Sequence, residues 1–262
     1  MSILVGCDPE IFVQQRGVFK SAHALIPGDK KNPFKVDKGA VQVDGMALEF
    51  NIDPAATDDE FVINVKSVYE QLCKMVPGYD LVATPVAHFD AAYMKKQPAE
   101  ALELGCDPDY NAWTGQANEK PDANRPMRTA SGHVHIGWTN NKNIEEHSHV
   151  SDAFAVTRQC DFFLGLGSLF YDEDKERREM YGKSGCCRVK PYGVEYRTLS
   201  NAWLQSEARM RWVFNRVQDA MNALYKGICL QDKYGDIQEI INSSDKKSAL
   251  KILKAERIEV PV

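Results

Sequence analysis

The stretch Val41-Gln-Val-Asp-Gly-Met-Ala-Leu-Glu-Phe50 places the dipeptide Asp44-Gly45 between two runs in which apolar and polar residues alternate. An Asp-Gly dipeptide flanked by alternating runs is the strongest short-range sequence signal for a β-hairpin. The stretch therefore predicts two antiparallel strands joined by a tight turn. Because side chains alternate along a strand, Leu48 and Phe50 should face the core, and Glu49 should face the opposite side of the sheet.

Further strands and helices are expected around this hairpin. A helix over 57–76 is indicated by a capping box, Thr57 followed by Glu60, and by apolar residues at helical spacing. The other expected strands cover 3–5, 11–13, 81–88, 132–138 and 192–199. The other expected helices cover 145–171, interrupted near Gly165 and Gly167, then 204–226, 235–242 and 246–255. The order lacks a regular strand–helix–strand alternation, so we expect an α+β domain built on an antiparallel sheet.

The composition excludes several classes of protein. A net charge of −5 over 262 residues argues against a general nucleic-acid or membrane-surface binder, which would need a basic excess. The longest apolar stretch, 162–170, is shorter than the roughly 20 residues that cross a bilayer, and the start MSILVGCDPE lacks the features of a signal peptide. The 7 cysteines, an odd number without a CxxC pair, argue against a disulfide framework and a structural zinc site. We therefore expect a cytoplasmic protein with reduced thiols.

Four of the strand segments carry polar side chains two residues apart, which places both members of a pair on one face of a sheet. The pairs are Asp8 and Glu10, Glu49 and Asn51, His133 and His135, and Glu195 and Arg197. The opposite face would bury Val5, Ile11, Leu48, Phe50, Val134, Ile136, Val194 and Tyr196. Each pair alone also has an ordinary explanation: a solvated turn or sheet face for the carboxylates, one packed and one exposed imidazole for the histidines, and an ion pair for Glu195 and Arg197. A concave face that holds divalent cations explains the whole set of carboxylates and imidazoles.

A basic segment follows these pairs in the second half of the chain. Its cations are Arg177, Arg178, Lys183, Arg188, Lys190 and Arg197, interleaved with glycines. Guanidinium groups match phosphate and carboxylate oxygens, although a solvated charged loop would have the same composition. No phosphate-loop, dinucleotide-binding, GxSxG or HExxH motif is present. Carboxylates for hard cations together with arginines for oxyanions favour a site for a metal–nucleotide complex and an acidic substrate.

Several blocks, taken in their order along the chain, match one known family. They are Gly6-Cys-Asp-Pro-Glu-Ile-Phe12, Asp44-Gly-Met-Ala-Leu-Glu-Phe-Asn51 with Pro54, Ser131-Gly-His-Val-His-Ile-Gly137, Arg178 with Tyr181-Gly182, Gly185 and Arg188, and Pro191-Tyr-Gly-Val-Glu-Tyr-Arg-Thr-Leu-Ser-Asn201. In these blocks the chain resembles the phage-type COOH-NH2 ligases of type 2, within the glutamine synthetase and glutamate-cysteine ligase-like amidoligase superfamily. The resemblance spans roughly residues 3–225, and the order of the blocks is its specific part.

The resemblance implies a fold and a division of the chain. The implied fold is a glutamine synthetase-like curved antiparallel sheet with helices packed on its outer face. The concave face would bind ATP and Mg²⁺, or Mn²⁺ in its place. Residues 1–230 would form the amidoligase catalytic domain, and residues 231–262 would be a C-terminal polar helical appendage.

Carried over residue by residue, the resemblance also implies roles in the site. The metal ligands would be Glu10, Glu49 and Glu195, assisted by Asp8 and His135. The catalytic residues would be Arg188, which steadies the transferred phosphoryl group, Arg197, which contacts the substrate carboxylate or phosphate, and Glu195. The nucleotide would be contacted by Arg178, Lys190 and the two histidines. Which of His133 and His135 contacts the metal and which the phosphates is left open.

The activity implied by the resemblance is an ATP-dependent ligation of a carboxylate to an amine through an acyl phosphate. The substrates would be small molecules or peptides, and the protein would act in the cytoplasm, that of a host if a phage encodes it. Three alternatives stay open: a guanidino-type phosphotransferase on the same fold, a metal-dependent hydrolase using both histidines, and a catalytically inactive phage-encoded binding protein. The loop over 96–131, with Tyr110, Trp113 and Arg125, is either a lid or a surface insertion. A homo-oligomer is left open because rings occur in part of the superfamily.

Overall fold

The computed structural model describes residues 3–102, 109–119, 125–139 and 146–261. The strands are β1 Leu4–Cys7, β2 Glu10–Gln15, β3 Val18–Lys20, β4 Phe34–Val36, β5 Gly39–Asp44, β6 Ala47–Ile52, β7 Asp80–Val82, β8 Val86–His88, β9 Tyr110–Asn111, β10 Met127–Thr129, β11 Val134–Gly137, β12 Cys186–Lys190 and β13 Gly193–Tyr196. The helices are α1 Asp58–Met75, α2 Ala91–Met94, α3 Ala99–Leu102, α4 His147–Cys160, the π-helix η1 Asp161–Gly165, α5 Leu166–Ser168, α6 Glu176–Met180, the 3-10 helix η2 Asn201–Gln205, α7 Glu207–Tyr225, α8 Leu230–Tyr234, α9 Gln238–Asn242 and α10 Lys246–Ala255.

The predicted hairpin is present as β5 and β6, whose register runs from Gly39 opposite Ile52 to Asp44 opposite Ala47. The turn consists of Gly45 and Met46, one residue later than the expected dipeptide, so Asp44 is the last strand residue. Gly45 has a φ of 57°, and a positive φ at the first turn residue is the conformation that favours glycine in two-residue hairpin turns.

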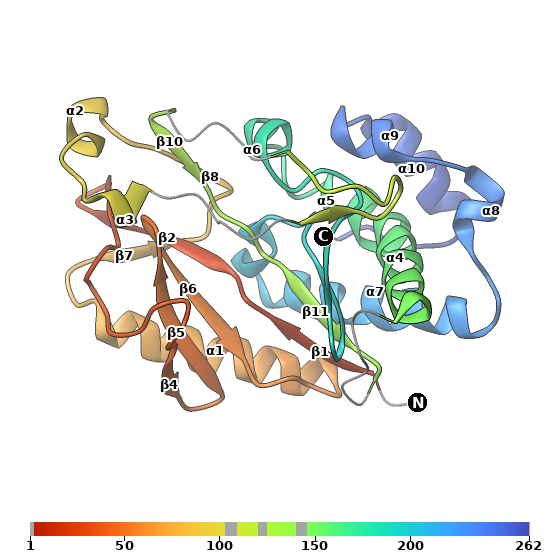
Figure 1. The fold of residues 1–262 in the computed structure, drawn as a ribbon, viewed down its shortest axis with the longest axis horizontal. Coiled ribbons are helices and arrows are strands. Elements are labelled where there is room, and N and C mark those ends of the chain that lie inside the picture. The colour runs from red at the N-terminus through yellow and green to blue at the C-terminus, as the bar shows by residue number, and fades with distance from the viewer. Residues whose placement is uncertain (1–2, 103–108, 120–124, 140–145, 262) are drawn as a thin grey trace.

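Two sheets are joined where β1, in one sheet, is followed directly by β2, in the other. Their strand orders are β1-β11-β13-β12-β9 and β3-β2-β6-β5-β4, and every pairing among the described residues is antiparallel. In Figure 1, β1 and β2 follow each other as one long red ribbon, with β11 beside β1 and β6 beside β2. The α+β architecture on antiparallel sheets is confirmed, and the closer likeness to glutamine synthetase stays a prediction.

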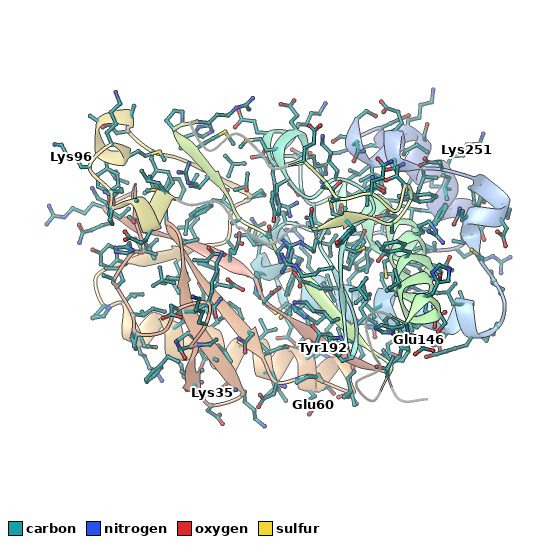
Figure 2. The ribbon with its side chains drawn as sticks, viewed as in Figure 1. Lys35, Glu60, Lys96, Glu146, Tyr192 and Lys251 are labelled. Atoms are coloured by element: carbon teal, nitrogen blue, oxygen red, sulfur yellow. The ribbon has the colours of Figure 1, made fainter. Side chains whose placement is uncertain are left out.

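One face of the joined sheets forms the core. The eight apolar residues expected on this face are all fully buried and belong to one cluster. Helix α1 packs on β5 and β6, α4 packs on β12 and β13, and α7 contacts both helices (Figure 1). Helix α1 has the expected cap, because the Thr57 hydroxyl accepts from the Glu60 N–H and the Glu60 carboxylate accepts from the Ala56 N–H. Charged side chains such as Lys35, Lys96 and Lys251 lie at the outer surface of the molecule (Figure 2).

The opposite face is covered in part by β8, β10, α2 and α3. Phe12, Met46, Ala87 and Phe89 belong to a smaller apolar cluster there. The prediction of one strand over 81–88 was wrong, because β7 pairs with β2 whereas β8 pairs with β10. The chain leaves the sheet of β2 at Ala83-Thr84-Pro85, and proline cannot donate the hydrogen bond that a continuous strand would need.

The C-terminal residues pack against the interrupted helix rather than standing apart. Ile237, Ile241 and Leu253 share an apolar cluster with Phe162 and Leu166. The expected interruption of the helix over 145–171 is present as η1, which separates α4 from α5. A domain boundary near residue 230 stays a prediction.

Two general expectations also have structural counterparts. Over the described ranges, no helix combines the length and the apolar character needed to cross a membrane. The cysteines in these ranges are all free thiols, namely Cys7, Cys73, Cys160, Cys186, Cys187 and Cys229.

Gly132, just before β11, and Gly137, its last residue, differ in the space around them. A Cβ at Gly132 would lie 2.3 Å from Trp203 Nε1 and 2.4 Å from the Ser200 carbonyl oxygen, whereas one at Gly137 would be no closer than 3.6 Å to any atom. We expect Gly132→Ala to lower the free energy of unfolding by about 2–3 kcal/mol, since overpacking displaces buried groups. Gly137→Ala should change it by less than about 1 kcal/mol. Urea unfolding of both variants is the measurement, and equal losses would contradict this packing.

Candidate active site

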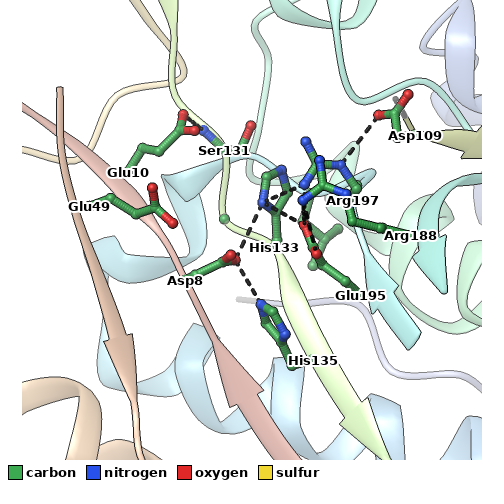
Figure 3. Close-up of polar contacts among 12 residues, drawn as sticks. Asp8, Glu10, Glu49, Asp109, Ser131, His133, His135, Arg188, Glu195 and Arg197 are labelled. Atoms are coloured by element: carbon green, nitrogen blue, oxygen red, sulfur yellow. Dashed lines mark hydrogen bonds and ion pairs between the residues drawn. The ribbon is translucent and has the colours of Figure 1, made fainter. Parts of the chain in front are cut away.

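A cavity of about 900 Å³ opens on the polar face of the joined sheets. Its floor carries Asp8 from the link between β1 and β2, Glu10 from β2, Glu49 from β6 and Arg188 from β12, with Arg197 directly after β13. The walls come from residues 23–31, the hairpin turn, β10 and α6. Side chains that are far apart in the sequence therefore share one space, with carboxylates on one side and arginines on the other (Figure 3). The volume lies in the range of small-molecule sites.

Glu10 and Glu49 form the acidic side of the cavity. They are register partners on β2 and β6, so their side chains lie next to each other on one face. Glu10 Oε2 accepts a 2.8 Å hydrogen bond from the Ser131 N–H, and Glu49 Oε2 accepts a 2.9 Å bond from Gln42 Nε2. Within the described ranges, neither carboxylate has an ion pair with a cation.

The pKa values of Glu10 and Glu49 are raised by burial and by neighbouring carboxylates. Burial, and next the charge of Asp44, raise the pKa of Glu10 to about 8. Burial and the carboxylates of Asp8, Asp44 and Glu10 raise the pKa of Glu49 well above its ordinary value. Like charges held together in a partly buried site favour the protonated form until a cation is bound. Glu10 and Glu49 are thus the carboxylates that a divalent cation would stabilise most.

Asp8 lies between the acidic pair and the two imidazoles. Its Oδ1 is 3.3 Å from His133 Nδ1 and 3.1 Å from His135 Nε2. Burial opposes ionisation of Asp8, but the two imidazoles outweigh it and hold its pKa well below the ordinary value. In turn, burial opposes protonation of His135, but Asp8 raises the pKa of this imidazole. The other nitrogen of His135, Nδ1, is hydrogen-bonded to the Tyr192 hydroxyl, at the turn between β12 and β13 (Figure 2).

Glu195 is surrounded by cations. Arg188 Nη1 lies 3.4 Å and Lys190 Nζ 3.0 Å from its Oε2, and Arg197 Nη1 contacts its Oε1. Burial and Asp8 oppose ionisation, but Arg197 and both imidazoles lower the pKa of Glu195 to about 2. Burial and the charge of Arg197 lower the pKa of His133 to about 4, so this imidazole is neutral at pH 7. Among the predicted residues, His135 and Glu195 do not line the cavity but contact Asp8 and Arg197, which do. Lys190 does not line the cavity either, and it pairs with Glu195.

The donor set fits a divalent cation. One ligand atom each from Asp8, His135 and Glu195 lie within 4.8 Å of one another. His133 Nε2 is buried without a hydrogen-bond partner in the described part of the chain. Carboxylate oxygens suit Mg²⁺ or Mn²⁺, whereas imidazole nitrogens are ligands for transition-metal ions. The acidic pair of Glu10 and Glu49 is the better candidate, because Glu195 is already paired with cations.

Two arginines of the basic segment are not brought to the cavity. Arg178, predicted to contact the nucleotide, is buried, pairs with Asp172 at 3.2 Å and donates to the Asp172 and Asp174 carbonyls. Arg177 is fully buried and donates to the Thr198 and Leu199 carbonyls and to Ser131. The charge pattern alone could not separate them from Arg188, because α6 turns both side chains inward while β12 presents Arg188 to the cavity.

The structure describes only part of the loop over 96–131, which was expected to be either a lid or a surface insertion. Residues 103–108 and 120–124 lie outside the described residues, so the lid itself stays untested. Tyr110 and Arg125 are exposed. Trp113 donates a 2.7 Å hydrogen bond from Nε1 to Asp161 Oδ2, which anchors its part of the segment to η1.

Several residues of the site carried no assigned role in the sequence prediction. Gln42 and Asp44 alternate with Val41 and Val43, so the same two-residue rule that selected Glu49 could have found them. Asp109, which accepts a 3.3 Å bond from Arg197 Nε, and Lys30, which pairs with Asp44 at 2.8 Å, carry no such signal.

Residues 128–231 match the family described as Phage phiEco32-like COOH.NH2 ligase-type 2. This segment contains both histidines, Arg188, Glu195 and Arg197, whereas Asp8, Glu10 and Glu49 precede it. The match confirms the resemblance found in the sequence. The name of the family indicates a carboxylate–amine ligase, which supports a ligase activity in general. A comparison with curated proteins finds no match.

The raised pKa of Glu10 gives a test of the acidic pair. The carboxyl titrates near 4.5 in the unfolded chain and near 8 in the folded protein, so stability falls as the pH rises between these values. We expect Glu10→Gln to raise the free energy of unfolding by about 1–3 kcal/mol at pH 8.5 without divalent cations, and by much less at pH 5. Urea unfolding at both pH values, with Glu239→Gln on the exposed face of α9 as control, measures this. A gain that is equal at both pH values would contradict the prediction.

Proposed function

We propose that this chain, whose residues 128–231 match the phage-type ligase family, is an ATP-dependent carboxylate–amine ligase. The observation that carries the proposal is the charge separation in the cavity. Glu10 and Glu49, which form no ion pair with any described residue, lie on one side, and Arg188 and Arg197 lie on the other, with Asp8 and His133 between them. Such an arrangement suits a bound metal–triphosphate beside an anionic acceptor.

The acidic residues would hold the cations. Glu10 and Glu49 are the first candidates, and Asp8, His135 and Glu195 form the second group. Bound Mg²⁺ would supply positive charge that lowers the repulsion between ATP and an anionic nucleophile. Ser131 and Gln42 keep the two glutamates oriented through their hydrogen bonds. The neutral His133 offers Nε2 as a donor or ligand without adding charge.

The basic residues would bind the reacting oxyanions. A carboxylate is a poor acyl donor, because its oxygen is a poor leaving group. Its oxygen attacks the γ-phosphorus of ATP, the bond to ADP breaks, and an acyl phosphate forms. The amine nitrogen then attacks the carbonyl carbon, inorganic phosphate leaves, and the nitrogen loses a proton. Arg188, which lines the cavity, is suited to the charge on the transferred group, and Arg197 to the carboxylate or phosphate. No enzyme nucleophile is required.

The assay of ATP-dependent phosphate release with pooled acids and amines tests this function. A ligase releases phosphate only when both substrates are present, and mass spectrometry then detects an amide. A guanidino phosphotransferase would give a phosphorylated product and no free phosphate. A hydrolase would act without ATP, and an inactive binding protein would give no turnover. Any of these last three results would contradict the proposal.

The acidic pair should be essential for turnover. We expect Glu49→Gln to lower the rate of amide formation by at least about 100-fold, because one ligand of the cation is lost. Affinity for Mn²⁺, measured by titration calorimetry, should fall in parallel. The matched control Glu239→Gln should keep both properties. Wild-type turnover by Glu49→Gln would remove this carboxylate from the mechanism.

Arg188 should act on the transferred group more than on the nucleotide. We expect Arg188→Ala to lower ADP formation by about 100-fold or more, since it removes a donor to developing charge. Nucleotide affinity should change by less than about fivefold. The exposed Lys35 on β4 provides a control as Lys35→Ala. Equal losses of rate and affinity would argue against this role.

A further inference from the structure

Asp161 is a buried carboxylate that the proposed chemistry does not use. It is the first residue of η1, and its side chain is fully buried. Its oxygens accept from Trp113 Nε1 at 2.7 Å, from the Ser184 hydroxyl at 2.6 Å and from the Tyr196 hydroxyl at 2.8 Å. The Thr198 hydroxyl lies 3.4 Å from Asp161 Oδ1 but closer, at 3.1 Å, to the Lys183 carbonyl oxygen. Within the described ranges Asp161 has no ion pair, so neutral donors alone solvate it. Removing such a partner would leave buried polar groups unsatisfied.

These donors come from segments that carry residues of the candidate active site. Tyr196 is the last residue of β13 and directly precedes Arg197, so by side-chain alternation it leaves the backbone on the side opposite to Arg197. Asp161 therefore holds this part of the chain from the core side while Arg197 contacts Glu195 and Tyr181 on the other.

A second connection reaches Arg197 from the cavity side. Trp113 belongs to the described segment 109–119, in which Asp109 Oδ2 accepts a 3.3 Å hydrogen bond from Arg197 Nε. Asn118 donates to Asp109 Oδ1 at 3.1 Å, and the Asn118 N–H donates to the Asp109 carbonyl, so this segment is internally tied. Because Trp113 anchors the segment to Asp161, one carboxylate supports Arg197 through both its backbone and its partner Asp109.

The π-helical geometry of η1 leaves room for the hydrogen bond between Tyr196 and Asp161. The chain widens into the π-turn of η1 at Asp161, and such turns commonly accompany functional sites. A Cβ at Gly165, the last residue of η1, would lie 2.9 Å from the Tyr196 hydroxyl and 3.3 Å from Asp161 Oδ1. The absence of a side chain at Gly165 is therefore what lets the Tyr196 hydroxyl reach Asp161.

We propose that Asp161 is a positioning residue for Arg197: through Tyr196 on one side, and through Trp113 and Asp109 on the other, it sets where the guanidinium lies in the cavity. The proposal rests on the proposed function only in that Arg197 contacts a substrate oxyanion. The positioning of Arg197 by Asp161 does not depend on whether the protein has catalytic activity.

The test observes the Arg197 side chain directly. Its Nε–H signal is recorded by ¹H–¹⁵N NMR of the full-length protein and assigned by its absence in Arg197→Lys. In Asp161→Asn one acceptor oxygen becomes an amide donor, and Trp113→Phe removes only the indole N–H. We expect the Arg197 signal to shift, or to be lost through faster exchange with water, in both variants. Asp152→Asn, an exposed change on α4, should leave it unchanged.

An unchanged Arg197 signal in either folded variant overturns the proposal. If Asp161→Asn does not fold, Trp113→Phe alone decides, because a phenyl ring keeps most of the packing. A kinetic arm then separates this proposal from the proposed function. In an active enzyme, Trp113→Phe should lower kcat by on the order of 10-fold, and less so in an Asp109→Asn background, where the connection is already broken. A wild type without ligase activity, combined with a shifted Arg197 signal, would overturn the function and keep the positioning role.

Discussion

The hydrogen bonds on both sides of residues 8–10 join the two sheets, and the site depends on them. The N–H groups of Asp8 and Glu10 donate to the His133 and Ser131 carbonyls at 3.3 and 2.8 Å, and the Pro9 carbonyl accepts from the Phe50 N–H at 3.2 Å. This short stretch thereby lies between the strand of Glu49 and the segment of His133. Because backbone pairing fixes which side chains share a face, Asp8 and Glu10 must project into the same space as the carboxylate and imidazoles of their neighbours.

Carboxylates gather on the N-terminal strands of the site and cations on its C-terminal strands. This separation explains the pKa shifts of the glutamates. The strands on the N-terminal side present carboxylates to one another, so burial and mutual repulsion raise the pKa values of Glu10 and Glu49. The strands on the C-terminal side surround one carboxylate, Glu195, with cations, which lower its pKa despite its burial. A polyanion that carries its own divalent cations would complement both sides at once, with metal against the acidic pair and phosphate oxygens against Arg188. This complementarity, rather than any single residue, supports the proposed nucleotide chemistry.

Much of this arrangement could be predicted from two-residue alternation. The rule selected Asp8, Glu10, Glu49, His133, Glu195 and Arg197 for one face and the eight buried apolar residues for the other, and the structure has them so. Other assignments did not come from this rule. Arg178, which the resemblance placed at the nucleotide, lies in α6, where helical geometry turns it toward Asp172. The strand expected over 81–88 is divided, because pairing partners, not local pattern, decide where a strand leaves a sheet.

The sequence by itself determined the antiparallel pairing around Asp44-Gly45, the two faces of the strands and the residue types available to the site, because these follow from local backbone sterics and side-chain alternation. Only the tertiary structure decided which carboxylates meet without an ion pair among the described residues, which one is paired with cations, and that Asp109 and Asp161 support Arg197 from two sides. Ion pairs and hydrogen bonds between segments as distant as Asp109 and Arg197 depend on the packing of whole strands and helices, and no periodicity in the chain encodes such distances.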